Sequence, residues 1–446
     1  MRLPIKHPDK PKVREALPAT LRLYRALMTA AAPLAPLLLS YRLKRGKEDA
    51  SRLRERYGEA GIARPRGPLV WVHGASVGEI TAVLPLIRRL CDRGLGVLVT
   101  SGTTTSAELA QQRLPAGAIH QFVPLDVPAF VDRFLDHWHP DLALFVESDL
   151  WPNLVTAAAA RRVPLVLVNG RLSQRSFGRW QKVPRTIAAV LQRLALCLAQ
   201  SPADAERYAA LGGQHVTMTG NLKLDVPAPP ADPAEVEALR AAIGARPVIA
   251  AASTHPGEEA AVMDAHQRLR RNFPALLTVM APRHPHRGAD IADLARSLGL
   301  SAVLRSRGEN PATETDIYIA DTLGELGLIY RVAPIVFMGG SLVEHGGQNP
   351  IEPIKLGAAI LHGPHVWNFA DIYSALDQAH GAEQVQDATR LAGCITAWLT
   401  DNQQRCAVTE AGLRTVESLG GALDRTSQAL EPYLTPLLVG RNSANA

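Results

Sequence analysis

Glu79 is the carboxylate in this sequence whose position best suits acid–base chemistry. It follows an apolar stretch, 69–73, that predicts a strand, and it begins an apolar stretch, 80–90, that predicts a helix. Glycines at 74 and 78 let a ligand approach the intervening loop closely. The helix N-terminus favours an ionised carboxylate, which a general base requires, and should lower its pKa, so such a base would act through positioning. Alternatively, Glu79 only caps its helix.

Two further candidates lie in the first half of the chain. Glu147-Ser148-Asp149 resembles the acidic triplet that holds a divalent metal in some enzymes, yet no His or Asp with ligand spacing accompanies it. We therefore interpret Glu147 as part of an acidic site without a metal. Lys223, in the loop 220–225, is a cation that could face a phosphate, or an ordinary solvated side chain.

The second half offers loops suited to an anion. Residues 282–287 carry Arg283 after an apolar strand, and arginine suits bidentate capture of phosphate. In the loop 339–352, glycines free backbone N–H groups to meet an anion, Pro350 suits a helix start, and Glu352 could accept hydrogen bonds from a ribose. Neither G-x-G-x-x-G nor G-x-x-x-x-G-K-[ST] occurs, which disfavours dinucleotide and P-loop sites.

Short apolar strands alternating with helical stretches must position these residues. The predicted strands are 69–73, 96–100, 142–146, 165–169, 194–199, 216–219, 248–252, 276–280, 317–320, 335–338 and 359–362. A proline-rich connector, 226–233, separates two such series. This pattern predicts an α/β protein with two doubly wound, Rossmann-like domains facing a cleft. The candidate loops follow the carboxyl ends of strands, where open α/β sheets bind ligands.

The N-terminal part differs in charge and hydropathy from the rest. The chain of 446 residues has a net charge of +6, but residues 1–66 carry +10 and the remainder −4. This distribution argues against a nucleic-acid groove and fits an anionic membrane surface or an acidic ligand. Residues 26–41 lack charges and span roughly 24 Å as a helix, less than the ~30 Å hydrocarbon core. They either enter a membrane or form an apolar helix docked on the protein.

Cysteine usage and chain length also limit the possible compartment and domain organisation. Four scattered cysteines lack the paired spacing of a zinc ribbon and fit reduced thiols in the cytosol. The expected organisation is a basic, apolar membrane-associating segment at 1–46, an N-terminal Rossmann-like domain at 47–228 and a C-terminal Rossmann-like domain at 229–446.

Taken together, these motifs resemble those of 3-deoxy-D-manno-octulosonic acid (Kdo) transferases. The matching segments are 48–58, 74–79, 147–154, 169–173, 220–225, 252–255, 282–284, 321–326 and 339–352. The departures from the family pattern are Ser148-Asp149 where Thr-Glu is usual, Gly170 where Ala is common, and Gln348 where His is common. They leave the expected reaction class unchanged.

The resemblance implies a GT-B glycosyltransferase at the cytoplasmic side of the inner membrane, in contact with its lipids. It further implies that 47–228 is the acceptor domain and 229–446 the CMP-sugar (donor) domain. The enzyme would transfer Kdo from CMP-Kdo to the lipid A precursor (lipid IVA) by an inverting displacement, with no metal and no cofactor. Glu79 would take the proton of the acceptor's glucosamine 6-hydroxyl, while Glu147 and Lys223 stabilise an oxocarbenium-like transition state. The expected donor-binding residues are Ser253, Pro282, Arg283, Leu323, Gly324, Glu325, Asn349, Pro350, Ile351 and Glu352.

CMP-Kdo has one phosphate, so Arg283, Lys223 and helix N-termini could stabilise the leaving group without a bound metal. Two other interpretations remain open at this point. One is a sugar-nucleotide epimerase or another glycosyltransferase of the same fold, which would need a uridine-diphosphate site. The other is a membrane-attached module that binds acidic lipid or glycan and does not need an ionised Glu79.

Overall fold

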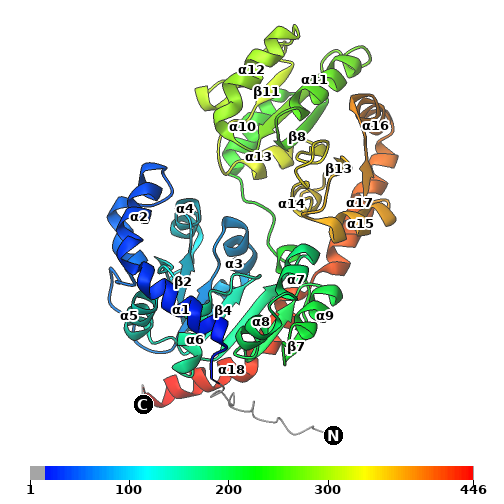
Figure 1. The fold of residues 1–446 in the computed structure, drawn as a ribbon. Coiled ribbons are helices and arrows are strands. Elements are labelled where there is room, and N and C mark those ends of the chain that lie inside the picture. Colours follow the sequence, from blue (N-terminus) through cyan, green and yellow to red (C-terminus); the bar gives the residue numbers. More distant parts are fainter. Residues whose placement is uncertain (1–15, 445–446) are drawn as a thin grey trace, which may run out of the picture. The chain divides into compact units, whose positions relative to one another are not determined.

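The computed structural model describes residues 16–444, which form two compact units (Figure 1). Unit 2 is the continuous stretch Pro227–Leu419, and unit 1 comprises the described residues before it together with those from Gly420 onward. The sequence-based boundaries placed 229–446 in one domain, so the units differ from them in the last helix. That helix, α18 (Ala422–Ala444), buries Leu430 and Leu434 in the core of unit 1.

Unit 1 is built on a parallel seven-stranded sheet in the order β3-β2-β1-β4-β5-β6-β7. Its strands are β1 (Leu69–His73), β2 (Gly96–Ser101), β3 (Ala118–Phe122), β4 (Leu142–Val146), β5 (Leu165–Gly170), β6 (Leu196–Ala199) and β7 (Val216–Met218). β1 and β4 are completely buried, as their unbroken apolar sequences indicate for strands covered on both faces. The predicted Rossmann-like architecture is confirmed.

Helices cover both faces of this sheet. They are α3 (Val77–Asp92), α4 (Thr104–Arg113), α5 (Pro128–Trp138), α6 (Pro152–Ala160), α7 (Gln174–Trp180), α8 (Pro184–Leu191), α9 (Pro202–Ala210) and α18, with the 3-10 turns η2 (Ala50–Tyr57) and η3 (Leu222–Leu224). One core layer contains Ile80, Ile87 and Leu430, and the layer on the other face contains Phe134 and Leu191.

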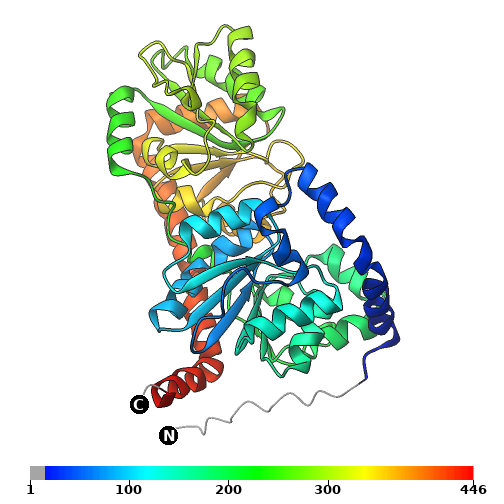
Figure 2. The ribbon, with the colours of Figure 1, turned by 90° about the vertical axis from the view of Figure 1, so that its left-hand side faces the viewer.

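The apolar N-terminal stretch forms α1 (Ala19–Ala31), η1 (Ala32–Leu34) and α2 (Ala35–Lys44), which lie along the side of unit 1 (Figure 2). By length and composition, Ala19–Lys44 is the one helix among the described residues that could cross a membrane. Leu37 is 70% exposed, and most of the stretch is accessible. The Tyr24 hydroxyl nevertheless donates to Asp126 Oδ2 (2.9 Å), so the helix also contacts the protein.

Unit 2 contains a second parallel seven-stranded sheet, in the order β10-β11-β9-β8-β12-β13-β14. The strands are β8 (Val248–Thr254), β9 (Leu277–Pro282), β10 (Ala302–Leu304), β11 (Ile317–Ile319), β12 (Ile335–Met338), β13 (Ala359–His362) and β14 (Ala382–Gln384). The helices are α10 (Pro233–Ile243), α11 (Glu258–Leu269), α12 (Gly288–Ser297), α13 (Leu326–Val332), α14 (Ile351–Lys355), α15 (Ala370–Gln378), α16 (Ala388–Thr400) and α17 (Asn402–Leu419), with η4 (Pro285–Arg287) and η5 (Arg305–Arg307).

The sequence analysis missed β3, β10 and β14, which are all edge strands. β3 has the sequence Ala-Ile-His-Gln-Phe, and β14 is the half-exposed Ala-Glu-Gln. An edge strand needs fewer apolar side chains because one side has no neighbouring strand, so hydropathy alone does not reveal it.

Candidate active site

The chain order of unit 1 reverses between β1 and β4, which are adjacent in the sheet. The connections that leave two such strands run in opposite directions, which opens a crevice at their carboxyl ends. Glu79 belongs to the connection after β1, and Glu147 follows β4 directly. The two carboxylates that the sequence singled out therefore flank the topological switch point of one sheet.

Glu79 is held in a capping box at the start of α3. The Ser76 hydroxyl accepts a hydrogen bond from the Glu79 N–H (3.3 Å). In return, Glu79 accepts one from the Ser76 hydroxyl (3.0 Å) and one from the Ala75 N–H (2.7 Å). Glu79 therefore does cap its helix. Each of its carboxylate oxygens accepts only one of these hydrogen bonds and keeps a lone pair that can accept another proton.

The expectation of a lowered pKa at Glu79 is wrong. Burial raises the pKa of Glu79, and the negative charge of Glu147 raises it further. The hydrogen bonds from Ala75 and Ser76 favour the ionised form, but they do not reverse the shift. Sequence position revealed the helix terminus but not the second carboxylate beside it. A raised pKa makes Glu79 a stronger base once it is ionised.

Glu147 and Lys223 meet in an ion pair, with Lys223 Nζ 2.7 Å from Glu147 Oε1. Glu147 has a left-handed backbone (φ 59°), which turns the chain immediately after β4. Lys223 is positioned by η3, where the Asn221 side chain accepts the Lys223 N–H (3.0 Å) and the neighbouring Leu222 is buried. The sequence identified both residues, and the structure adds that they contact each other.

Asp149 has a partner that the sequence analysis missed. The fully buried His73, the last residue of β1, places Nε2 3.2 Å from Asp149 Oδ2 and Nδ1 2.9 Å from the Thr100 hydroxyl. Burial raises the pKa of Asp149, but the hydrogen bond and charge of His73 outweigh it and the net pKa is lowered. Asp149 and Glu147 thus have separate partners. Within the described residues, no group of three or more His, Cys, Asp or Glu side chains could hold a metal ion.

In unit 2 the switch point lies between β8 and β12. Ser253 is near the carboxyl end of β8, and the loop 339–352 follows β12. The fully buried carboxylate of Glu258 accepts the N–H groups of Gly340 (2.6 Å), Ser341 (2.9 Å) and Leu342 (2.9 Å), besides that of His255 (2.9 Å). The expectation that the glycines leave these N–H groups for an external anion is therefore wrong. The anion they bind is a side chain of the protein.

Close backbone packing explains why glycine is required at this loop. A Cβ atom at Gly339 would lie 2.5 Å from the Ser253 carbonyl oxygen. Ser253 itself is left-handed (φ 57°), and the pairing of β8 with β9 shifts register between Ala252 and Thr254. Ser253 is thus an irregular residue near the end of β8.

The next strand, β9, ends in Pro282, and the exposed Arg283 follows it with its N–H bound to the Thr254 carbonyl (3.0 Å). Beside it, the buried His255 stacks edge-on against His345 with ring centroids 3.8 Å apart. Burial and neighbouring positive groups lower the pKa of His255 to about 4, so this ring is neutral at pH 7. Arg283 is then the positive charge at this position that is open to a ligand.

Leu323, Gly324 and Glu325 form the loop before α13. Leu323 is 80% exposed and Gly324 is left-handed (φ 84°). The Glu325 carboxylate receives two hydrogen bonds from Arg305, each 2.6 Å, and Arg305 lowers its pKa. Arg305 comes from η5, and the sequence analysis did not connect the two residues.

Residues 349–352 form the start of α14. Pro350 precedes its first residue, Ile351, as the sequence predicts for a helix start. The Asn349 side chain accepts the Ile351 N–H (3.1 Å) and donates to Glu352 Oε1 (3.4 Å). The donor-site candidates of unit 2 therefore lie in the last residues of β8 and β9 or on the loops after β9, β11 and β12, and these strands all end at the same edge of the sheet.

Sequence comparison finds relatives over almost the entire chain. The family model described as 3-deoxy-D-manno-octulosonic-acid transferase (kdotransferase) matches residues 51–226. The 3-deoxy-D-manno-octulosonic acid transferase of Haemophilus influenzae is 34% identical over 420 residues, which cover 92% of this chain and 98% of the relative. That of Bordetella pertussis is 35% identical over 418 residues, covering 90% and 97%.

Comparison with solved structures finds proteins of similar fold. A glycosyltransferase from Rickettsia africae has a TM-score of 0.58 and 12% identity, over 83% of this chain and 99% of that one. The C-terminal CMP-Kdo binding domain of WaaA from Acinetobacter baumannii aligns with 41% of this chain and 98% of its own, at 27% identity and a TM-score of 0.40.

The two Rossmann-like units, each with a parallel seven-stranded sheet, give the chain a fold of the GT-B type. Within that class, the extent of the sequence match decides the family. The chain belongs to the 3-deoxy-D-manno-octulosonic acid (Kdo) transferases, and it is an enzyme that transfers Kdo in lipopolysaccharide synthesis.

Proposed function

We propose that this enzyme transfers Kdo from CMP-Kdo to a hydroxyl group of the lipid A precursor, with inversion at the anomeric carbon and release of CMP. Family membership supports the transferred sugar. The observation that carries the mechanism is the arrangement at the unit 1 switch point. There, a carboxylate with a raised pKa, Glu79, lies within the electrostatic influence of a Lys223–Glu147 ion pair.

Glu79 is the general base in this proposal. Its oxygens accept two hydrogen bonds that fix their direction, and their remaining lone pairs can accept the proton of the acceptor hydroxyl. The oxygen of that hydroxyl forms the new bond to the anomeric carbon as the bond to the CMP phosphate breaks. Because burial and Glu147 raise its pKa, Glu79 binds the proton more strongly than an exposed glutamate would.

Glu147 and Lys223 have complementary roles in the proposal. Positive charge develops on the sugar ring in an oxocarbenium-like transition state, and the nearby negative charge of Glu147 stabilises it. Lys223 orients the Glu147 carboxylate through their 2.7 Å contact. Inversion follows from this single displacement, in which the acceptor oxygen attacks the anomeric carbon directly and no protein group forms a bond to the sugar.

Unit 2 is the donor-binding unit in this proposal. The exposed Arg283 suits the single phosphate of CMP-Kdo, and Asn349 with Glu352 offers polar groups at the start of α14 for the nucleoside. Glu325 contributes through the backbone of its loop, because its carboxylate is bound to Arg305.

We further propose that the enzyme works at the cytoplasmic side of the inner membrane. The exposed leucines of α1 and α2 would enter the lipid, and the exposed basic residues beside them would face anionic headgroups. These basic residues are Arg22, Arg25, Lys44, Arg45 and Lys47. An amphiphilic acceptor is reached most easily by an enzyme held at that surface.

The test is a transfer assay with CMP-Kdo and the lipid A precursor, read by CMP release and by the mass of the product. Glu79→Gln should lose roughly 10²–10⁴-fold in transfer rate and still bind CMP. The matched control is Glu108→Gln, which changes an exposed glutamate of α4 and should keep wild-type activity. An active Glu79→Gln enzyme would refute the role of Glu79. A wild-type enzyme that releases no CMP would refute the reaction.

A further inference from the structure

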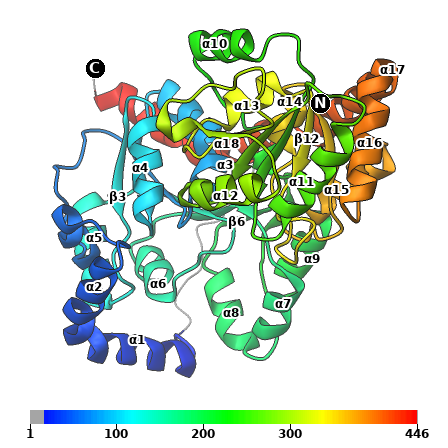
Figure 3. The ribbon, with the colours of Figure 1, turned by 90° about the horizontal axis from the view of Figure 1, so that it is seen from above.

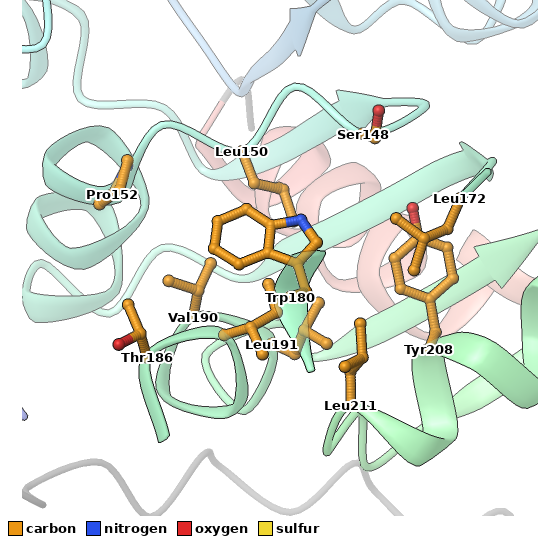
Figure 4. A pocket seen from close by; sticks show the side chains of 11 residues that line it. Ser148, Leu150, Pro152, Leu172, Trp180, Thr186, Val190, Leu191, Tyr208 and Leu211 are labelled. Carbon is orange, nitrogen blue, oxygen red and sulfur yellow. The ribbon is translucent and has the colours of Figure 1, made fainter. Parts of the chain in front are cut away.

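Unit 1 contains an apolar pocket that the proposed chemistry does not use (Figure 4). Its enclosed volume is small, about 40 Å³, and the pocket opens to solvent, so it has room for part of one chain only. Most of its wall is apolar: it includes Leu150, Leu172, Trp180, Val190, Leu191 and Leu211. Trp180 stands among these side chains and is 37% exposed, so its indole is open to a ligand from one side. The pocket suits a hydrocarbon chain.

The pocket adjoins the loop that contains Glu147. Ser148 and Leu150, which line it, belong to the connection between β4 and α6. Tyr208 lines the opposite wall, and its hydroxyl lies 3.2 Å from the Glu147 carbonyl oxygen. A chain in this pocket would therefore belong to a molecule whose polar part reaches Glu147.

An unusual run of positive charge borders the same pocket. Between positions 171 and 185 the sequence has five basic residues and no acidic one. They are Arg171, Arg175, Arg179, Lys182 and Arg185. None has an ion-pair partner among the side chains described for residues 16–439, although Arg56, Arg89, Arg93 and other arginines of unit 1 do. Unpaired arginines and lysines beside an apolar pocket fit a ligand that is both acylated and anionic.

The apolar N-terminal helix begins beside this pocket. The Thr20 hydroxyl of α1 lies 2.6 Å from the Thr186 hydroxyl, and Thr186 lines the pocket. Figures 2 and 3 show the start of α1 next to α8. The exposed Leu23 and Leu27 of α1 therefore extend the apolar surface outward from the pocket region. A membrane that contacts α1 would therefore lie close to the pocket.

We infer that the pocket beside Trp180 binds part of one acyl chain of the acceptor glycolipid, while the basic residues of 171–185 contact its phosphate groups. The identity of the acceptor rests on the function proposed above. The inference adds a binding site on unit 1 that would select an acylated acceptor and place its sugar near Glu147.

Fluorescence tests chain binding without requiring transfer. The full-length protein in neutral detergent is mixed with a lipid A precursor whose acyl chains end in bromine, which quenches an indole that it touches. We expect strong quenching in the wild type and a loss of most of it in Trp180→Phe. The matched control is Trp367→Phe, which removes an exposed tryptophan of unit 2 and should keep the quenching. Brominated detergent without the lipid should quench Trp180 only weakly.

Kinetics test the consequence for the acceptor. Trp180→Ala should raise KM about tenfold for the acylated acceptor and leave KM unchanged for the phosphorylated disaccharide without acyl chains. A merely structural role of Trp180 would alter both acceptors equally. The double variant Arg179→Gln/Lys182→Gln tests the phosphate contacts and should bind the brominated acceptor more weakly. A double variant with wild-type affinity would refute the contact between the basic residues and the phosphate groups.

These outcomes separate the two proposals. Trp180-dependent quenching without CMP release would refute the proposed reaction and keep the acyl-chain site. CMP release with equal quenching in wild type and Trp180→Phe, or equal quenching by the brominated detergent alone, would refute the acyl-chain site and keep the reaction.

Discussion

Replacement of Glu258 by glutamine tests how unit 2 holds its two central loops. The buried Glu258 carboxylate accepts four backbone N–H groups, two at each oxygen. Glutamine has nearly the same shape, but one oxygen becomes an NH₂ group that faces two N–H donors. Two charge-assisted bonds are lost, each worth roughly 1.5–3 kcal/mol, so we expect unfolding to require about 3–6 kcal/mol less. This is a large part of the ~5–15 kcal/mol stability typical of proteins.

The assay for Glu258→Gln is guanidinium denaturation, combined with hydrogen exchange at residues 339–342. The denaturation midpoint of unit 2 should fall, exchange should accelerate at Gly340, Ser341 and Leu342, and CMP affinity should decrease because these loops border the donor site. Glu237→Gln, at a side chain 72% exposed, is the control and should change stability by less than ~0.5 kcal/mol. An unchanged midpoint in Glu258→Gln would show that the carboxylate does not hold the loops.

Three further predictions concern unit 1. Lys223→Met removes the ion-pair partner of Glu147 at a partly exposed position, so the variant should have the circular dichroism spectrum of the wild type. Its transfer rate should fall roughly 10²–10³-fold, and a wild-type rate would exclude a role for the ion pair. Transfer should increase with pH as Glu79 loses its proton, with a midpoint above the ordinary glutamate pKa. In Glu147→Gln the midpoint should move to lower pH, because one cause of the raised pKa is gone; an identical pH profile would contradict this. Burial raises the pKa of Asp126 to about 6, so the folded protein binds this proton more tightly than the unfolded chain, whose Asp pKa is about 4. The protonated carboxyl therefore stabilises the fold fully below pH 4, and this stabilisation is lost as the pH rises through 6. Between pH 4 and pH 7 the wild type should lose about 3 kcal/mol of unfolding free energy that Asp126→Asn does not lose, measured by denaturation at each pH; equal losses would refute the assignment.

The sequence predicted most of the fold because buried parallel strands have a strong signature. Strands such as 69–73 and 142–146 are continuous apolar runs, and the predicted bounds of these two equal the observed ones. The same logic predicted that Glu79 and Glu147 would lie at one edge of a sheet. Loops after neighbouring parallel strands must meet there, whatever their detailed conformation.

The sequence did not predict which polar groups neutralise each other across elements. The Glu258 carboxylate and the N–H groups of Gly340 are 82 positions apart, and Arg305 reaches Glu325 from a separate 3-10 turn. The pKa of Glu79 was predicted in the wrong direction for the same reason. Its helix position is a local property, whereas its burial and the charge of Glu147 depend on tertiary structure.

The path of the chain through the two units has a consequence for synthesis on the ribosome. Unit 2 is an uninterrupted segment, so it is complete once Leu419 has emerged from the ribosome. Unit 1 then has all its strands but still lacks the helix α18, which covers part of its sheet. Until Leu430 and Leu434 arrive, one apolar face of α3 remains open to solvent. The chain leaves unit 1 after Val226 and returns to it at Gly420. The Asp225 carboxylate accepts the N–H groups of Gly421 and Leu423 and so joins the end of the first segment to the start of the second. We therefore expect the nascent first half to depend on chaperones longest, and a chain that stops at Leu419 to aggregate through unit 1 although its unit 2 is complete.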